Sequence, residues 1–505
     1  MLQLHGVIPV IFKGYALVIP ELLLIVAALW ALFSDRLPGR GRGASVVAAV
    51  LVLLGGVVLG CTAAGTSIFG GKLLLTIDAR FGGVVLCLLV LVWLIWTAAA
   101  GSGRTAEAVA LVCLSLAGAL LATQAADLIV LLLSLELTSQ PVYVLIGYRH
   151  NRPKGLEGAL KYFLLSILTS LFMFYGASFV FGLAQTTSFS KLQNLPSEPL
   201  AVVALLFLLV GIFAKMSVAP FHFWAPDAYE GAQPWVVAFA ATMPKIAGGF
   251  VLVRLMAALN AQIAILKWPI LIASVLCMVL GSLGALTQKD IRRMMAYAGV
   301  TAMGYALLML GIVNTQITVT GWYFTVFFLA SYSLPTMGIL LICASEGSKF
   351  SDLAGLSHRR PLVSGALVIF VLSLIGIPPL VGFFGKFFIA LAGVAGGLLP
   401  FIVVMVIASV ISAFYYLRLV KAAFFDVPKQ AELPVAADVD GAQLFSQLLA
   451  SDEPGAPESE CEIAEEPAKR VPVGAEFALL LCAVLTFLAG PASGLIMTWM
   501  RNPPY

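Results

Sequence analysis

Apolar runs long enough to cross a lipid bilayer recur along almost the whole chain, and this repetition constrains the fold more than any other feature. One membrane-spanning helix needs about 20 mainly apolar residues. Of the 505 residues, 61% are hydrophobic and only 11% are charged, which excludes an ordinary soluble domain. The formal net charge of +4 gives no support for nucleic-acid binding. The sequence predicts an all-α polytopic membrane protein.

The runs predict fourteen transmembrane helices. They cover residues 14–33, 44–62, 81–100, 106–123, 126–147, 158–184, 199–217, 235–258, 264–286, 293–312, 320–343, 363–396, 398–423 and 474–499. The first run carries Pro20 and Glu21 and has no small-residue cleavage site after it, so we expect a retained helix rather than a signal peptide.

Prolines predict breaks in two of these helices. Pro378 and Pro379 divide the twelfth span, and the segment KMSVAPFHFWAPDAYEGAQP after the seventh span contains three prolines. Because proline removes a backbone donor and clashes with the preceding turn, we expect a broken twelfth helix, and a broken seventh helix followed by a loop.

Basic residues gather in alternate connections and predict the orientation of the helices. The odd-numbered loops carry or border Arg36, Arg40, Arg42, Arg149, Arg152, Lys154, Lys289, Arg292, Arg293, Lys349, Arg359, Arg360, Arg418 and Lys421. The even-numbered loops carry chiefly Lys72, Arg80, Lys191 and Lys267. Because cytoplasmic loops hold the excess of Lys and Arg, both termini are expected on the outer, periplasmic side.

Residues 427–473 depart from the apolar pattern. They are acidic, rich in Pro and Ala and poor in aromatic residues, a composition that cannot bury a core. We expect a flexible cytoplasmic loop there. The alternative is that its short GAQLFSQLLA piece forms an amphipathic helix that docks on a partner.

A few charged side chains fall inside the predicted spans, where they are costly. Glu136 lies about ten residues, or about 15 Å, from either end of its span, too far for its short side chain to reach water. The whole candidate set is Glu136, Lys161, Lys215, Lys245 and Lys386, with His222 at the first helix break.

Some of these charges have simpler explanations. Glu157 and Lys161 are four residues apart and could form an ion pair at the membrane interface. Arg254 and Lys267 lie near helix ends, so we expect both to extend to the lipid headgroups.

Buried lysines suit a proton relay because burial lowers the pKa of an ammonium group from about 10.4 toward neutrality, whereas a nearby carboxylate raises it again. A glutamate that approaches or leaves a lysine therefore makes a switchable proton site. Helix breaks add free backbone groups that line hydrated cavities. This combination predicts a proton path. The seven cysteines form no C-x-x-C pair and the four histidines offer no paired haem ligands, so no redox centre is expected in this chain.

The two predicted breaks lie five spans apart, which suggests an internal repeat. An odd number of helices per repeat forces opposite membrane orientations, as in many transporters. The implied division is 1–105 for the first three helices, 106–258 and 259–426 for two inverted five-helix repeats, 427–473 for the loop and 474–505 for the last helix.

Four segments resemble the antiporter-like membrane subunits of respiratory complex I, the proton-pumping NADH:quinone oxidoreductase. They are LLSLELTS, AKMSVAPFHFWAPDAYEGA, QKDIRRMMAYAGVTAMGY and GIPPLVGFFGKF. Among these subunits the chain is most similar to the N type, called subunit 2 in mitochondria. The features that carry this similarity are the segment WAPDAYEGA, the lysine in GFFGKF, the early segment IPELLL and the TID at Asp78. The resemblance covers the chain outside residues 427–473.

This resemblance implies a fourteen-helix fold with two inverted repeats, and a role for each candidate residue. Glu136 and Lys215 would form a functional ion pair, Lys161 would be the sixth-span lysine, and Lys245 the central lysine. His222 would belong to the connecting relay. Lys386 would be the terminal site toward the external side.

The resemblance also implies no cofactor in this chain, with NADH, FMN, iron–sulfur clusters and quinone in other subunits of the complex. Its partners would be those membrane subunits and lipids, in a bacterial inner membrane. Two other functions stay open on the sequence, a subunit of a multi-subunit sodium/proton antiporter and a structural scaffold with vestigial lysines.

The chain departs from the family pattern at one place. Family members commonly have A-Y-S-S-x-x-H where this chain has AYAGVTA, so Ala298 and Gly299 replace hydroxyl residues and Ala302 replaces the histidine. A relay through this point is expected to depend on water, Thr301, Tyr297 or Tyr305.

Overall fold

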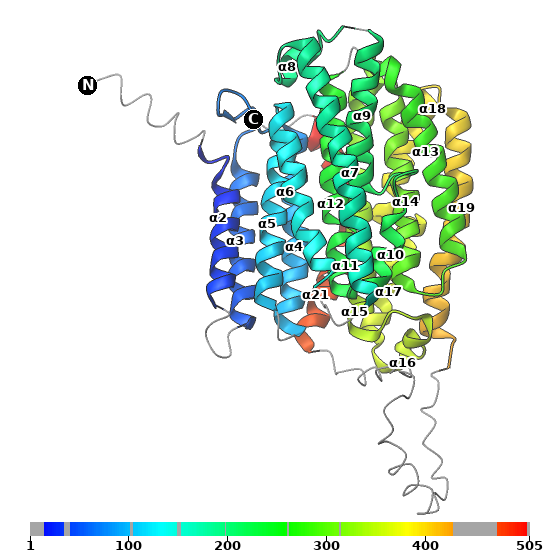
Figure 1. The fold of residues 1–505 in the computed structure, drawn as a ribbon. Helices are drawn as coiled ribbons and strands as arrows, with labels where there is room; N and C mark the ends of the chain where they lie inside the picture. Colours follow the sequence, from blue (N-terminus) through cyan, green and yellow to red (C-terminus); the bar gives the residue numbers. More distant parts are fainter. Residues whose placement is uncertain are drawn as a thin grey trace, which may run out of the picture.

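The helices form one bundle whose members run nearly along a common axis (Figure 1). The computed structural model describes residues 15–34, 41–100, 105–148, 153–196, 198–259, 262–312, 315–427 and 472–501. Almost all of the predicted loop at 427–473 lies outside the described residues, so the expectation for it stays a prediction.

The first half of the chain contains α2 (Ile19–Ser34), α3 (Gly41–Cys61), the hairpin β1 (Ser67–Ile68) and β2 (Leu73–Leu74), α4 (Ile77–Ala100), α5 (Thr105–Gln124), α6 (Leu128–Ile146), α7 (Pro153–Ala184), α8 (Phe189–Leu192), α9 (Pro199–Met216), α10 (Trp224–Gly231), α11 (Pro234–Ala240) and α12 (Met243–Ala258). The second half contains α13 (Ile263–Leu286), α14 (Ile291–Leu308), η2 (Met309–Gly311), α15 (Thr315–Glu346), η3 (Phe350–Leu353), α16 (Leu356–Arg359), α17 (Pro361–Ile375), α18 (Val381–Ala395), α19 (Leu399–Phe424), α21 (Val473–Leu488) and α22 (Ser493–Arg501).

The all-α membrane fold is confirmed. Within the described residues, 11 helices are long and apolar enough to cross a membrane, and α2, α17, α18 and α21 are shorter apolar helices. The count of fourteen spans and the two inverted repeats stay predictions.

Both predicted helix breaks are present. Residues 217–223 separate α9 from α10, and residues 376–380 separate α17 from α18. The segment after the first break is not only a loop, because α10 forms within it. Two further breaks were not predicted. Ala241 and Thr242 divide the eighth span into α11 and α12, and residues 489–492 divide the last span into α21 and α22.

The centre of the bundle is formed by α11, α12 and α15. The most apolar windows of Pro234–Ala258 and Gly321–Glu346 are 100% buried, whereas those of α3 and α19 are 33% buried. In Figure 1, α2 and α3 stand at one end of the bundle and α19 at the other. A polar group on α12 or α15 is therefore shielded from lipid by protein on every side.

Candidate functional site

A buried ion pair joins Lys215, in the last turn of α9, to Glu136 in the middle of α6. Lys215 Nζ lies 2.9 Å from Glu136 Oε1, and the two side chains are 2% and 19% exposed. Helix α9 stops one residue later because Ser217 adopts a left-handed conformation, with φ of 59°. The free carbonyls at a helix C-terminus favour a cation. The helix end and Glu136 together hold the Lys215 ammonium in the apolar interior.

Hydroxyl groups of α6 and α7 surround this pair. Lys215 Nζ also donates to Ser166 Oγ at 2.9 Å and to Tyr143 OH at 3.1 Å. Ser170 donates to Glu136 Oε1, and the hydroxyls of Tyr143 and Ser166 hydrogen-bond to each other. Because a hydroxyl both donates and accepts, this cluster offers a proton several alternative positions.

His222 lies in the break between α9 and α10. The residue is only 4% exposed, and its Nδ1 has no hydrogen-bond partner among the described residues. It lies within electrostatic reach of Lys245, and its ring centroid is 6.3 Å from that of Tyr297. The break therefore places a buried imidazole near Lys245 of α12 and Tyr297 of α14.

Lys245 directly follows the unpredicted break between α11 and α12. It is 1% exposed, and its Nζ has no hydrogen-bond partner in the described part of the chain. The Tyr229 ring centroid is 5.3 Å from this Nζ. A Cβ at position 299 would collide with Nζ, so Gly299 makes room for it. Because an ammonium without hydrogen bonds is costly to bury, this is a poor structural position for a permanent charge and a suitable one for a group that exchanges its proton.

Lys386 reaches across the second break from α18 to the end of α17. Its Nζ donates to the carbonyl oxygens of Leu374 at 2.8 Å and Ile375 at 2.9 Å, and to Ser409 Oγ of α19 at 2.9 Å. Leu374 and Ile375 are the last two residues of α17, whose terminal carbonyls have no partner within the helix. Lys386 therefore caps the end of α17 and is also a partly buried titratable group.

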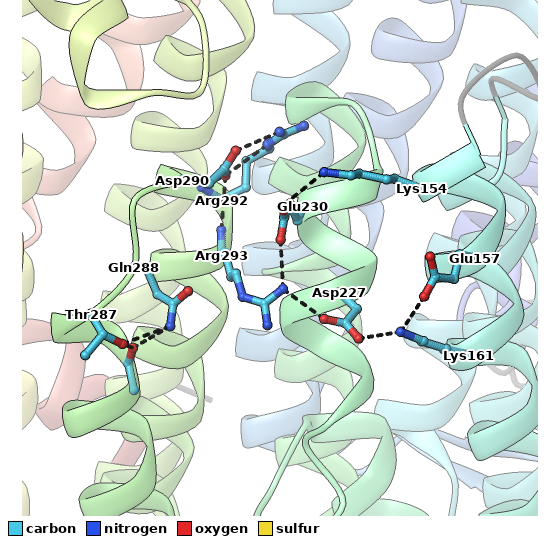
Figure 2. Close-up of polar contacts among 11 residues, drawn as sticks. Lys154, Glu157, Lys161, Asp227, Glu230, Thr287, Gln288, Asp290, Arg292 and Arg293 are labelled. Atoms are coloured by element: carbon cyan, nitrogen blue, oxygen red, sulfur yellow. Dashed lines mark hydrogen bonds and ion pairs between the residues drawn. The ribbon is translucent and has the colours of Figure 1, made fainter. Parts of the chain in front are cut away.

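Lys161 lies apart from the other candidates. Its side chain is 47% exposed and pairs with Glu157 at 2.7 Å and with Asp227 at 2.8 Å (Figure 2). The interface pair considered from the sequence is thus present, and the structure does not place Lys161 at a buried mid-span position. It joins an ion-pair network at the end of the bundle where α7 begins, not the Lys215 cluster.

That network ties α10 to α14. Arg293 Nη1 lies 2.9 Å from Asp227 Oδ1 and 2.7 Å from Glu230 Oε2 (Figure 2). Burial alone would raise the pKa of Asp227, but the bonds to Lys161 and Arg293 outweigh it and lower the pKa. These ion pairs link α7, α10 and α14 at the end of the bundle where α7 begins.

Two buried charges were missed or misplaced by the sequence. Arg254 was expected to extend to headgroups, and this is wrong, because its Nη1 donates inside the protein to Thr123 O at 2.7 Å and Leu74 O at 3.2 Å. Glu21 is 2% exposed and accepts a hydrogen bond from Gln124 at 3.0 Å. Its place in the first apolar run was the available signal. Ser166 and Ser170 carried no such signal, because single serines are common in membrane helices.

The described side chains supply acid–base groups rather than metal ligands. Among them, no group of three or more His, Cys, Asp or Glu residues could hold a metal ion. The arrangement as a whole is a series of buried and partly buried groups that can each bind or release a proton.

The sequence matches a known family. A family profile described as "NADH:quinone oxidoreductase/Mrp antiporter, TM" matches residues 125–412. Subunit N of the NADH-quinone oxidoreductase of Rhodospirillum rubrum is 37% identical over 68% of this chain and 72% of its own length. Subunit N 2 of Acidobacterium capsulatum is 33% identical over 96% of this chain and 98% of its own length.

Solved structures of similar chains agree with these sequence matches. A chain of respiratory complex I from Thermus thermophilus with bound aureothin is 29% identical, with a TM-score of 0.77 over 95% of this chain and 99% of that chain. A chain of the Mrp complex from Dietzia sp. has a TM-score of 0.80 over 97% of this chain and 96% of that chain, at 20% identity. The second likeness shows a shared fold alone.

Proposed function

The chain belongs to the NADH:quinone oxidoreductase/Mrp antiporter membrane family, among the N subunits of NADH-quinone oxidoreductase, and we propose that Glu136, Lys215, Lys245 and Lys386 are the groups through which it moves protons. It is an antiporter-like, proton-pumping membrane subunit of respiratory complex I, and its partners are other membrane subunits of that complex. NADH, FMN, iron–sulfur clusters and quinone act in other subunits under this proposal.

One observation carries the assignment of residues. Each of the three lysines Lys215, Lys245 and Lys386 adjoins a break in a helix within the described chain. Lys215 precedes the break at 217–223, Lys245 follows the break at 241–242, and Lys386 follows the break at 376–380. A break frees backbone groups and lets a segment hinge, so the surroundings of each ammonium can change.

The ion pair is the switch in this proposal. While Glu136 stays 2.9 Å from Lys215, its negative charge holds a proton on the lysine. When Glu136 moves away, the buried ammonium loses its counter-charge and passes a proton by way of His222 toward Lys245. Glu136 is the more exposed partner of the pair, so it is the member that a neighbouring subunit can reach.

Lys386 is the proposed terminal site. A proton that arrives from Lys245 is held there by the carbonyls of Leu374 and Ile375 and is then released toward the external side. Lys161 takes a different role in this proposal, as an anchor of the network around Asp227. We also propose that the chain lies in a bacterial inner membrane with both termini on the periplasmic side, and that it contains the two inverted five-helix repeats.

The runner-up function is a subunit of a multi-subunit sodium/proton antiporter. Its support is the fold shared with the Mrp complex, whereas the relatives at 33–37% identity over most of their length are N subunits. The sequence likeness therefore favours complex I.

NADH-driven acidification of inverted membrane vesicles tests the assignment of residues. Lys245→Ala should abolish most of the acidification while native gels show a fully assembled complex. Lys154→Ala is the matched control, because Lys154 is 81% exposed and lies outside the buried set. Normal acidification with Lys245→Ala would refute the assignment, and acidification driven by a sodium gradient without NADH would favour the runner-up.

A further inference from the structure

A cavity of about 420 Å³ lies where the β1–β2 hairpin, α8, the end of α12 and the start of α15 meet. Figure 1 shows α8 and α16 at opposite ends of the bundle, and α16 belongs to one of the basic loops. The cavity is therefore at the end that the charge pattern predicts to face outward. Sites for small ligands usually measure about 300–1,000 Å³, so this space is large enough for a bound molecule.

One buried cation lines this cavity. Arg254 is 7% exposed, and its Nη1 donates to the carbonyls of Leu74 and Thr123 and to Thr76 Oγ1. These are the hydrogen bonds that the guanidinium makes within the described chain, so Nε and Nη2 keep unused donors. A guanidinium that is held in place and still has free donors is well suited to bind a phosphate or carboxylate group.

One carboxylate lines the same cavity. Asp78, in the first turn of α4, is partly buried and forms no hydrogen bond or ion pair with another described residue. It lies within electrostatic reach of Arg254 without contacting it. A cation and an anion that line one cavity and do not meet suit a ligand that carries both charges.

The rest of the wall combines an indole donor with apolar side chains. Trp322 Nε1 is buried and has no hydrogen-bond partner in the part of the chain that the structure describes. Trp322 and Tyr323 lie at the start of the apolar span Gly321–Glu346, and such residues are common at the level of the lipid headgroups. Val253 and Val326 add apolar surface. The wall thus suits an amphipathic molecule.

The depth of the cavity agrees with a lipid headgroup. Arg254 lies four residues before Ala258, the end of α12, or about 6 Å along the helix axis. Ala126, just before α6, also lines the cavity. Further along α6, Ile129 and Leu133 are 53% and 59% exposed and share one face of the helix. An acyl chain that leaves the cavity therefore has an apolar helix surface to follow into the bilayer.

We propose that this cavity binds the headgroup of a zwitterionic phospholipid with a primary ammonium, of the phosphatidylethanolamine type. Its phosphate accepts hydrogen bonds from Arg254 and Trp322 Nε1, and its ammonium pairs with Asp78. An anionic lipid such as phosphatidylglycerol offers the same phosphate but no ammonium, so Asp78 stays unpaired. Burying a charge without a partner is costly, and this cost selects the zwitterion. The bound lipid links the hairpin to α12 and α15.

Photocrosslinking in the intact complex tests the site. The complex is placed in nanodiscs of equal parts phosphatidylethanolamine and phosphatidylglycerol, with a diazirine at the start of one acyl chain of either lipid in turn. Mass spectrometry then measures labelling of segments 189–193 and 322–326. Labelling by phosphatidylethanolamine should be several-fold stronger in the parent.

An isosteric variant separates the carboxylate from the fold. Asp78→Asn keeps the shape of the side chain and removes its charge, so the ratio of the two labels should fall toward one while native gels show an assembled complex. Lys191→Gln is the matched control, because Lys191 is exposed on α8 and does not line the cavity. This control should keep the ratio of the parent.

A water-soluble headgroup distinguishes a lipid from a free phosphate ester. Radiolabelled glycerophosphoethanolamine should not be retained by the complex in nanodiscs of phosphatidylglycerol alone, because it lacks the acyl chains that hold a lipid at the site. Its retention by the parent would overturn the lipid and assign the cavity to a soluble ligand. Equal labelling by both lipids, or a ratio that Asp78→Asn leaves unchanged, would overturn the site itself. None of these measurements uses NADH or turnover, so their failure is distinct from a failure of the proposed function.

Discussion

The ion pair between Lys215 and Glu136 provides the sharpest test of whether a buried charge in this chain is structural or functional. Lys215→Met removes the ammonium and keeps a side chain of similar length. Glu136 then loses its counter-charge at 2.9 Å and keeps only the hydrogen bond from Ser170. Removing one partner of a buried pair costs about 3–5 kcal/mol. Because Glu136 is 19% exposed and stays hydrogen-bonded, we expect the lower end of that range.

The double variant Glu136→Gln with Lys215→Met should recover most of this stability. Replacing a whole buried ion pair by neutral groups is often neutral or stabilising by about 1–4 kcal/mol, because no charge is left unpaired. The temperature at which the solubilised complex dissociates on native gels measures the effect. The single variant should dissociate at a lower temperature than the double variant, and the double variant should resemble the parent.

The variant that regains stability should not regain proton pumping. Both variants should fail to acidify inverted vesicles on addition of NADH, because neither retains a lysine that can load and release a proton. Lys215→Arg should be stable and should also fail, since an arginine does not lose its proton in a protein. If the double variant recovers both stability and acidification, the pair is structural and the switch proposed for it is wrong.

Three further predictions concern Lys386, the segment 430–468 and Asp227. Lys386→Arg should assemble, because a guanidinium can still donate to the carbonyls that end α17, but vesicle acidification should be low, whereas normal acidification would make Lys386 an anchor only. Deletion of residues 430–468 should leave NADH-driven turnover close to that of the parent, and a collapse of turnover in an assembled complex would show that the loop has a partner. Asp227→Asn should lower the dissociation temperature slightly, by the equivalent of roughly 1 kcal/mol or less, because solvent screens its half-exposed ion pair with Lys161. The pKa of Asp227 is lowered below 3.8, so its ion pairs contribute their full stability above pH 3.8 and lose it only as the pH falls further. A stability change centred near pH 7 would contradict the assignment of this contribution to Asp227.

The sequence by itself determined the fold class, the family and two of the helix breaks. These properties depend on local pattern, because the length of an apolar run decides whether a segment can span a bilayer, and a proline such as Pro220 or Pro379 removes a helical hydrogen bond and favours a break at its own position. The pairing of Glu136 with Lys215 was expected from the resemblance alone, and the structure brings the two side chains together.

The tertiary structure decided what surrounds each charge. Lys161 and Lys215 look alike in sequence, as single lysines in apolar segments, yet Lys161 meets Asp227 at an exposed position and Lys215 meets Glu136 in the interior. Arg254 could not be placed from its position near a helix end, because its acceptors come from residues more than 100 positions away. Burial and hydrogen bonding are set by the side chains that distant helices bring into contact, and no local pattern of hydrophobicity records those contacts.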